Sequence, residues 1–346
     1  MRALVRTGKG PGEVEVRCVE YPKPKLGWVT IAVKACGICG SDVHMYLSEW
    51  PGSLPDVERP TPIFGHEFSG EVVEVGEGVK NFAEGDRVTC MPKMYCGKCY
   101  YCQSGLTFLC PNEPLLSGAI AEYVSAPEYT LFKISENLTY EEAALAEPFA
   151  VAVAAVHRTS NLRLGQTIMI IGPGPIGLLT LIAAKLVSPK LTIVTGTGED
   201  KFRLQLARKF ADCTIDVTLE DPVEKIKAMT NGLGVDVVYE CAGAGLLDQI
   251  IEILRAGGEF VAIGHPTTKT QIKISTSGYM KAQFKQLKMT GHIIYDRESF
   301  NLALRLLESG KADVKPLITH KVSLSNAVQG FELAMKKEAV KVLIIP

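Results

Sequence analysis

Composition and charge set broad limits on the class of this protein. The chain has 346 residues, of which 47% are hydrophobic and 22% charged, so we predict folded domains rather than disorder, and the length favours two of them. The formal net charge of −1 argues against nucleic acid or an anionic membrane surface as a partner.

The first ten residues, MRALVRTGKG, contain no apolar segment and no cleavage-site pattern, so we expect no secretory signal and a cytoplasmic location. Thiols stay reduced in the cytoplasm, and clustered cysteines there indicate metal ligands or redox groups. A charge-free run over residues 168–184 contains three glycines and two prolines, and it fits a strand, turn and helix better than a membrane span.

Residues 1–150 contain short apolar runs bounded by glycine, proline or charge, such as VTIAVKA and GEVVEVG, and these predict β-strands. Metal-binding side-chain types are dispersed among them. They come from KACGICGSDVH, FGHEFSG and ALAEPFAV, and they are Cys36, Cys39, Ser41, His44, His66, Glu67 and Glu147.

Thiolate, imidazole and carboxylate together favour a zinc site of the mixed kind that commonly keeps a position open for water or substrate. Each residue also has a structural interpretation. The cysteines would be small buried side chains, and Glu67 a surface carboxylate. Glu147 is harder to explain in this way, because an acid within AALAEPFAVAVAAV is costly to bury unless it is paired or coordinated.

The stretch YCGKCYYCQSGLTFLC places four cysteines in C-x2-C-x2-C-x7-C spacing, namely Cys96, Cys99, Cys102 and Cys110. Four thiolates complete a tetrahedral shell, so the spacing predicts a structural zinc site. A redox C-x-x-C pair would stand at a strand-to-helix junction, and here the setting is loop-like. A nucleic-acid-binding zinc ribbon would carry a basic patch, whereas only Lys93 and Lys98 are charged nearby.

From residue 166 apolar strands alternate with helix-compatible stretches, which predicts βαβ units around a parallel sheet. The first unit contains TIMIIGPGPIGLL, with Gly172, Gly174 and Gly177 in G-x-G-x-x-G spacing and a helix start at Pro175 and Ile176. Glycines at these points permit a tight turn, close approach of a pyrophosphate and helix–strand packing, so we predict a dinucleotide site.

The second strand, LTIVTG, ends at Gly196, where an NAD-binding site commonly has an acidic residue. A glycine leaves room for the 2′-phosphate of NADP, and Lys201 or Arg203 could neutralise that phosphate. Glu199 or Asp200 could instead bind the ribose of NAD, or these charges could be the exposed first turn of a helix. We expect NADP, with NAD as the alternative.

Two later strands lead into loops that begin near Cys241 and Ile263, and both are candidate nicotinamide contacts because ligands bind at the carboxyl edge of such sheets. A further strand starts near residue 288, a helix covers 299–309, and the tail ends in KVLIIP. We therefore predict a zinc-binding domain over 1–150 completed by the C-terminal tail, a cofactor domain over 151–290, and a return to the first domain over 291–346.

In this order, CGICGSDVH, GHEFSGEVVEVGEGV, GDRV, the four-cysteine lobe, AEPFAVAV and GPGPIGL resemble the zinc-dependent medium-chain dehydrogenases over nearly the whole chain. The sequence looks most similar to the polyol branch (sorbitol or L-iditol dehydrogenases), with threonine dehydrogenases as near relatives. The resemblance implies an α/β protein with a GroES-like β-rich catalytic domain and a Rossmann domain. It also implies that Cys39, His66 and either Glu67 or Glu147 bind catalytic zinc, and that the protein is a homodimer or homotetramer.

Family members use the positions of Ser41 and His44 to move the alcohol proton to water, and we expect the same here. The alternatives are a turn hydroxyl for Ser41 and a solvated helix residue for His44. Asp42 could orient the loop or a metal ligand without binding the metal itself.

The segment PNEPLLSGAI after Cys110 is shorter than its usual polyol-branch counterpart, which favours a larger substrate such as a sugar acid, sugar phosphate or cyclitol. Arg297 is either a contact for an anionic substrate or a surface residue. The sequence thus predicts a zinc- and NAD(P)-dependent polyol dehydrogenase. A threonine dehydrogenase is the alternative, and a non-catalytic nucleotide-binding protein or a zinc ribbon is less favoured.

Overall fold

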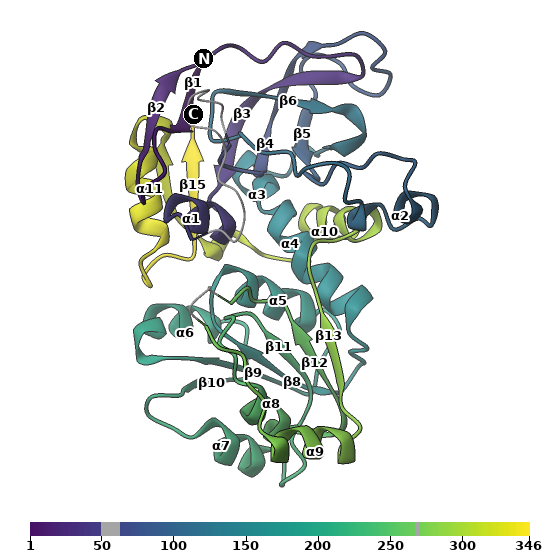
Figure 1. The fold of residues 1–346 in the computed structure, drawn as a ribbon, viewed down its shortest axis with the longest axis vertical. Helices are drawn as coiled ribbons and strands as arrows, with labels where there is room; N and C mark the ends of the chain where they lie inside the picture. Colours follow the sequence, from purple (N-terminus) through teal and green to yellow (C-terminus); the bar gives the residue numbers. More distant parts are fainter. Residues whose placement is uncertain (50–62, 267–269) are drawn as a thin grey trace. The chain divides into compact units, whose positions relative to one another are not determined.

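The computed structural model describes residues 1–49, 63–266 and 270–346. The chain divides into two compact units, which are described separately (Figure 1). Unit 1 comprises Met1–Ala150 and Tyr295–Pro346, and unit 2 comprises Val151–Ile294.

Unit 1 is built on a mixed seven-stranded sheet with the order β14-β15-β3-β4-β5-β7, and β6 also pairs with β3. The pair β14–β15 is parallel and the other pairs are antiparallel. A separate antiparallel ribbon joins β1 to β2. The strands are β1 (Arg2–Arg6), β2 (Val14–Cys18), β3 (Trp28–Gly37), β4 (Glu67–Val75), β5 (Arg87–Cys90), β6 (Tyr123–Pro127), β7 (Leu131–Lys133), β14 (Ile318–Ser323) and β15 (Lys341–Ile345).

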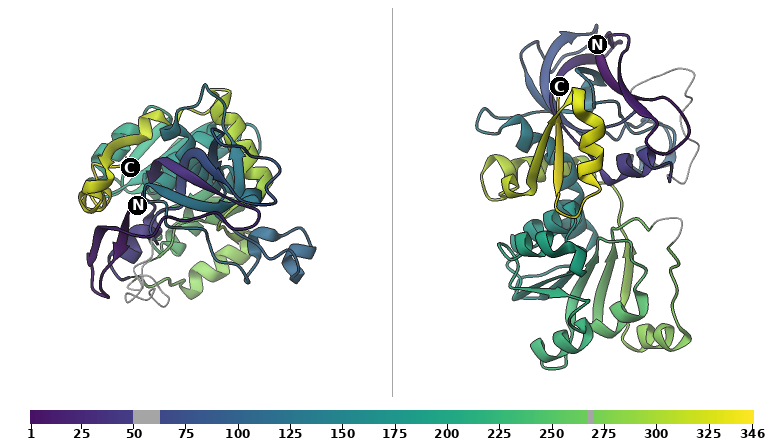
Figure 2. Two further views of the ribbon diagram at one scale, coloured as in Figure 1. Left: turned by 90° about the horizontal axis from the view of Figure 1, so that it is seen from above. Right: turned by 90° about the vertical axis from the view of Figure 1, so that its left-hand side faces the viewer.

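Unit 1 also contains short helices, some of which contact this sheet, and the last of them before residue 155 continues beyond the end of the unit. They are α1 (Gly40–Tyr46), α2 (Tyr100–Gln103), α3 (Tyr140–Ala144), α4 (Ala146–Ala154), α10 (Arg297–Glu308) and α11 (Ala327–Ala334). The C-terminal strand β15 pairs with the end of β3, and α11 lies beside it (yellow in Figure 2). Chain segments from both ends of the sequence therefore meet in one sheet near α1.

Unit 2 is a six-stranded parallel sheet with the order β10-β9-β8-β11-β12-β13. Its strands are β8 (Thr167–Ile171), β9 (Leu191–Gly196), β10 (Cys213–Asp216), β11 (Val235–Glu240), β12 (Leu254–Ala262) and β13 (Lys288–Gly291). Its helices are α5 (Pro175–Lys185), α6 (Lys201–Ala207), α7 (Pro222–Met229), α8 (Leu247–Ile253) and α9 (Thr276–Phe284), and a π-helical turn (Ala155–Thr159) follows α4.

The strand β8 is buried along its whole length, as expected of a central parallel strand covered on both faces. The charge-free run over 168–184 is divided between β8 and α5. Among the described residues, no helix is both long and apolar enough to cross a membrane. The predicted α/β fold class, a β-rich unit and a parallel-sheet unit, is confirmed.

Candidate metal and cofactor sites

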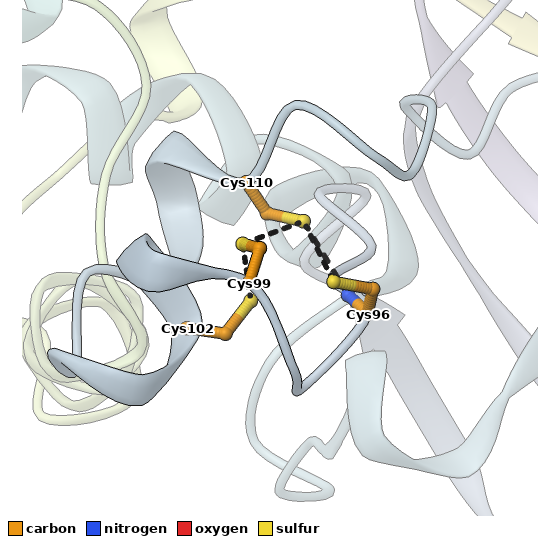
Figure 3. Close-up of side chains that lie close together, drawn as sticks. All are labelled: Cys96, Cys99, Cys102 and Cys110. Carbon is orange, nitrogen blue, oxygen red and sulfur yellow. Dashed lines mark hydrogen bonds between the residues drawn. The ribbon is translucent and has the colours of Figure 1, made fainter.

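The four cysteines of the lobe come together at one point (Figure 3). The sulfur–sulfur distances are 3.5 Å for Cys99–Cys102, 3.9 Å for Cys99–Cys110 and 3.7 Å for Cys96–Cys110. These distances are too long for disulfides and suit four thiolates around one ion. The helix α2 begins directly after Cys99, so the turn that the chain makes there places the second and third cysteines side by side.

Hydrogen bonds around the lobe favour the thiolate form of Cys96 and Cys110, whose pKa values lie below the usual value. The pKa of Cys102 is raised instead, by burial and by its neighbouring thiols. The Asn112 amide donates to the Cys96 sulfur at 3.4 Å, and with nearby backbone amides it lowers the pKa of Cys96 to about 6. The Cys96 amide donates to the Cys110 sulfur at 3.4 Å. Lys93 fixes the base of the lobe, since its Nζ donates to the carbonyls of Cys110 and Glu113 at 2.7 and 2.8 Å. The lobe thus has the donor set and the support of a closed metal site.

The second group of ligand-type side chains is dispersed in sequence and compact in space. Cys39 is the residue before α1, while His66 and Glu67 stand at the start of β4, which pairs with β3. One ligand atom from each of the three lies within 4.8 Å of the other two. His66 and Glu67 are almost fully buried. Sulfur, nitrogen and carboxylate oxygen in this arrangement suit a zinc ion.

Asp42 joins the two chain segments that bear these ligands. Its Oδ2 accepts from the Cys39 amide at 3.0 Å, and its Oδ1 accepts from the Gly65 amide at 2.9 Å. Gly65 has φ +86°, and a Cβ there would lie 2.6 Å from the Cys36 sulfur. The buried Asp42 carboxylate therefore orients both ligand segments, and Cys36 packs behind them.

Glu67 has a buried cation as its partner. The Nζ of Lys341 in β15 donates to both carboxylate oxygens of Glu67, at 2.8 and 2.7 Å, and to the Ile38 carbonyl at 3.2 Å. Both side chains are at most 3% exposed. Burial alone would lower the pKa of Lys341, but the adjacent Glu67 carboxylate raises it above its usual value. Lys341 is thus held in its charged form within a buried ion pair.

Glu147, the second residue of α4, is outside the compact three-residue group but electrostatically coupled to His66. Its Oε1 accepts from the Tyr295 hydroxyl at 2.7 Å, and both side chains are buried. Burial raises the pKa of Glu147 to about 7, although His66 opposes the rise. The two candidate carboxylate ligands thus differ, because Glu67 is paired with a cation and Glu147 with a neutral phenol.

Ser41 and His44 lie one turn apart on α1, and both are partly exposed. The His44 Nδ1 lies 3.9 Å from a carboxylate oxygen of Glu49. No hydrogen bond between Ser41 and His44 is present in the described part of the chain. Arg297 opens α10, where it donates to the Tyr129 carbonyl at 2.6 Å and stacks on Phe132, so its guanidinium already has partners within the protein.

The glycine turn of unit 2 follows β8 and opens α5 at Pro175 and Ile176. Gly172 has φ +92°, which favours glycine. A Cβ on Gly177 would lie 1.9 Å from the Gly172 carbonyl oxygen, whereas a Cβ on Gly174 would meet nothing within 4 Å. The chain therefore packs tightly at the first and third glycines and leaves open space at the second, which is the pattern that a bound pyrophosphate needs.

Lys201 and Arg203, the two cations predicted to neutralise a 2′-phosphate, follow β9 and differ in exposure. Gly196 packs against the turn, since a Cβ there would lie 3.0 Å from Pro173. The Arg203 Nη1 lies 4.0 Å from Asp200, and the Arg203 side chain is only 11% exposed. Lys201 is exposed. A side chain at position 196 would thus crowd Pro173 and Asp200, and Lys201 is the more accessible of the two predicted cations.

The loops that begin at Cys241 and Ile263 follow β11 and β12 at the carboxyl edge of the sheet. The Cys241 amide donates to the Ile171 carbonyl at 2.9 Å, next to the glycine turn. Ile263 is 7% exposed. The structure thus brings the two predicted loops and the glycine turn to the same edge of the sheet.

Comparisons with known proteins agree with the metal-ligand clusters of unit 1 and the cofactor-site features of unit 2. Residues 25–136 match the family described as alcohol dehydrogenase GroES-like domain, and residues 175–309 match zinc-binding dehydrogenase. A sorbitol dehydrogenase of Halalkalibacterium halodurans is 36% identical, with 100% of this chain and 99% of the relative covered. The chain belongs to the zinc-binding alcohol dehydrogenase family. It is a zinc-type, NAD(P)-dependent alcohol dehydrogenase.

Other relatives of this dehydrogenase differ in their substrates. An L-threonine 3-dehydrogenase of Bacillus licheniformis is 34% identical, with 100% of this chain and 99% of the relative covered. A zinc-binding dehydrogenase from Sinorhizobium meliloti, solved with NADP, has a TM-score of 0.89 and 32% identity, with 100% and 99% covered. The 2R,3R-butanediol dehydrogenase of Bacillus subtilis has a TM-score of 0.86 and 34% identity, also with 100% and 99% covered. The family and its cofactors, zinc and NAD(P), are thus established, and the alcohol is not.

Sequence reasoning missed two residues of this dehydrogenase that contact candidate ligands, Lys341 and Tyr295. Lys341 opens the apolar strand KVLIIP, and a charge at such a position needs a partner, so the sequence did contain a signal for it. Tyr295 carries no comparable signal, since a tyrosine near a helix start is ordinary.

Proposed function

We propose that this dehydrogenase interconverts a secondary alcohol and a ketone in a polyol, sugar-derived or cyclitol substrate. The observation that carries the proposal is the buried group of mixed ligands, Cys39, His66 and Glu67, with Glu147 nearby. Mixed sets of this kind commonly leave a coordination position for substrate. The 36% identity to a sorbitol dehydrogenase supports the substrate class.

In this proposal Cys39 and His66, with Glu67 or Glu147, bind the catalytic zinc, and the four lobe cysteines bind the structural zinc. When bound, the catalytic zinc supplies the Lewis acidity that lowers the pKa of an alcohol. Lys341 balances the charge of Glu67, and Asp42 holds Cys39 and His66 in register. Ser41 and His44, on the partly exposed side of α1, take the alcohol proton to water.

The nicotinamide cofactor supplies the hydride acceptor. The turn formed by Gly172, Gly174 and Gly177 binds its pyrophosphate, and the loops at Cys241 and Ile263 border its nicotinamide ring. We propose NADP as the preferred form, because Gly196 leaves no carboxylate for the ribose and Lys201 is exposed. Separate fluorescence titrations with NADPH and NADH test this preference, and tighter binding of NADH would overturn it.

L-threonine oxidation is the second candidate reaction, because an L-threonine 3-dehydrogenase is nearly as similar as the sorbitol dehydrogenase. Initial rates over polyols, sugar acids, sugar phosphates, cyclitols and L-threonine, each with both cofactors, separate the two. We expect the highest kcat/KM on a polyol-like alcohol. A rate confined to L-threonine would contradict the proposal and establish the alternative.

We also propose a homo-oligomer built by a second copy of the chain at β13. This strand forms one end of the six-stranded sheet, and its four residues are exposed or partly exposed. Met289 within the strand is 48% exposed, and Phe284 and Ile293, which precede and follow the strand in sequence, are 80% and 55% exposed. Light scattering should give a dimer or tetramer, and Met289→Glu should shift it towards monomer. A wild-type monomer would refute this part of the proposal.

A further inference from the structure

The reversal of strand order in unit 2 lies between β8 and β11. From β8 the chain adds β9 and β10 on one side, and from β11 it adds β12 and β13 on the other (Figure 1). Ligands of open α/β sheets bind at such a point, outside the carboxyl ends of the strands. The last residues of the two strands, Ile171 and Glu240, are register partners. Glu240 therefore stands at the crevice where the cofactor is expected.

Glu240 is a buried carboxylate, 5% exposed, that hydrogen-bonds only to backbone groups in the described contacts. Its Oε1 accepts from the amides of Ala242 and Ala244 at 2.8 and 3.3 Å. Its backbone carbonyl accepts from the amides of Ile263 and Gly264 at 2.9 and 2.8 Å. One residue thus binds the loop after β11 through its side chain and the loop after β12 through its main chain.

The loops at this edge are in contact through their backbones. A Cβ on Gly243 would lie 2.4 Å from the His265 carbonyl oxygen, and a Cβ on Gly264 would lie 2.3 Å from the Gly243 amide nitrogen. A Cβ on Gly172, in the glycine turn, would lie 2.9 Å from the Ala242 Cβ. Because only the Ala242 methyl group stands between the loop after β11 and the glycine turn, and no side chain stands between Gly243 and residues 264–265, a shift of the loop after β11 must displace both neighbours.

We propose that Glu240 is a positioning residue for the nicotinamide cofactor. Its carboxylate folds residues 241–245 against the glycine turn and against residues 263–265, so that the backbone surface facing the cofactor exists before the cofactor binds. Preorganisation of this kind raises affinity because no loop has to be ordered on binding. The inference rests on the proposed cofactor contacts at Cys241 and Ile263, and it adds a residue that acts through them.

The same sheet offers a matched control. Glu259 in β12 is also a buried carboxylate, 6% exposed, and it accepts from the Asn161 amide at 2.8 Å. It is the register partner of Val237, three residues before Glu240, so it stands away from the carboxyl edge. Each of these hydrogen bonds is partly buried, so removing either carboxylate leaves backbone amides without their protein acceptor. Only the amides that bond to Glu240 belong to the proposed cofactor loops.

The test is a fluorescence titration of the folded full chain with NADPH and with NADH, which needs no turnover. We expect Glu240→Ala to weaken binding of the preferred cofactor at least about tenfold, the scale of one lost charge-assisted hydrogen bond. Glu240→Gln, which keeps an acceptor oxygen, should restore most of the affinity. Glu259→Ala should lower the unfolding temperature without changing the Kd.

Three outcomes would overturn the inference alone: wild-type affinity in Glu240→Ala, equal weakening in Glu240→Gln, or the same loss in Glu259→Ala. A wild-type chain that binds neither NADPH nor NADH would overturn the proposed function as well, so the two failures are distinguishable. If Glu240→Ala does not fold, Glu240→Asp takes its place. Its shorter carboxylate should also weaken binding, and unchanged affinity there would equally refute the inference.

Discussion

The two ligand clusters of unit 1 are built in opposite ways. The four-cysteine lobe draws all its ligands from residues 96–110, and its sulfurs are supported by amides and by Asn112. The dispersed cluster draws Cys39, His66 and Glu67 from two separate segments and adds a charged partner from β15. A local cluster of identical ligands closes a coordination shell, whereas a dispersed, mixed cluster allows neighbouring residues to tune the charge of its ligands.

We expect the largest loss of activity when a ligand of the dispersed cluster is removed. Cys39→Ala should lower kcat by more than the roughly 10–100-fold that is typical when only a residue holding a metal ligand is lost. The reason is that Cys39 is itself a proposed ligand. Steady-state rates on the best alcohol measure this, and Cys36→Ala, which removes a buried thiol outside the cluster, is the control. If Cys39→Ala kept a tenth of the wild-type kcat, its role as a ligand would be wrong.

The second prediction concerns the buried ion pair of the dispersed cluster. In the zinc-free protein, Lys341→Met should lower the free energy of unfolding by about 3–5 kcal/mol, because it leaves the Glu67 carboxylate buried without its lysine partner. Chemical denaturation measures this change. The double variant Lys341→Met/Glu67→Gln should recover part of the loss, since both groups are then neutral. Stability unchanged by Lys341→Met would contradict the pairing of these two side chains.

The third prediction sharpens the structural role of the lobe. Cys99→Ala should reduce the zinc content from about two ions per chain to about one and should lower the unfolding temperature, because the shell of four thiolates is then incomplete. The zinc that remains should support turnover in the folded fraction. Elemental analysis and thermal unfolding measure these changes. A stable, fully zinc-loaded variant would disprove the structural assignment.

The smallest expected effect comes from the phenol that holds Glu147. Tyr295→Phe removes the 2.7 Å hydrogen bond and keeps the ring in its contact with Phe300, so we expect about a tenfold loss of kcat with little change in stability. A shifted pH profile of kcat should accompany it, because the phenol no longer donates to the carboxylate. Tyr46→Phe, on another buried ring, should change neither kcat nor its pH profile. Wild-type kinetics in Tyr295→Phe would exclude a positioning role.

Several parts of this molecule could be predicted from the sequence because their determinants are local. The C-x2-C-x2-C-x7-C lobe and the glycine turn each lie within a dozen or so residues, and the alternation of apolar runs with helical stretches indicated the parallel sheet. The grouping of Cys39 with His66 and Glu67 came from the family resemblance, since spacing alone left Cys36 as an equal candidate.

Long-range pairings could not be predicted. Lys341 and Glu67 are 274 residues apart, and Tyr295 and Glu147 are 148 residues apart, so no local pattern connects them. The prediction that Lys201 or Arg203 could neutralise a phosphate did not include the ion pair between Arg203 and Asp200, which stands three residues earlier at the N-cap of α6. Such partners are decided by tertiary packing, and only a structure identifies them.

We propose that the substrate binds the metal at the dispersed cluster and not at the cysteine lobe. Cobalt-substituted protein tests it most directly, because a mixed cysteine, histidine and carboxylate site and a four-thiolate site have different visible spectra. Adding the alcohol that is oxidised fastest should change the bands of the mixed site, and these bands should be absent in Cys39→Ala. A change confined to the four-thiolate bands and retained in Cys39→Ala would contradict the account.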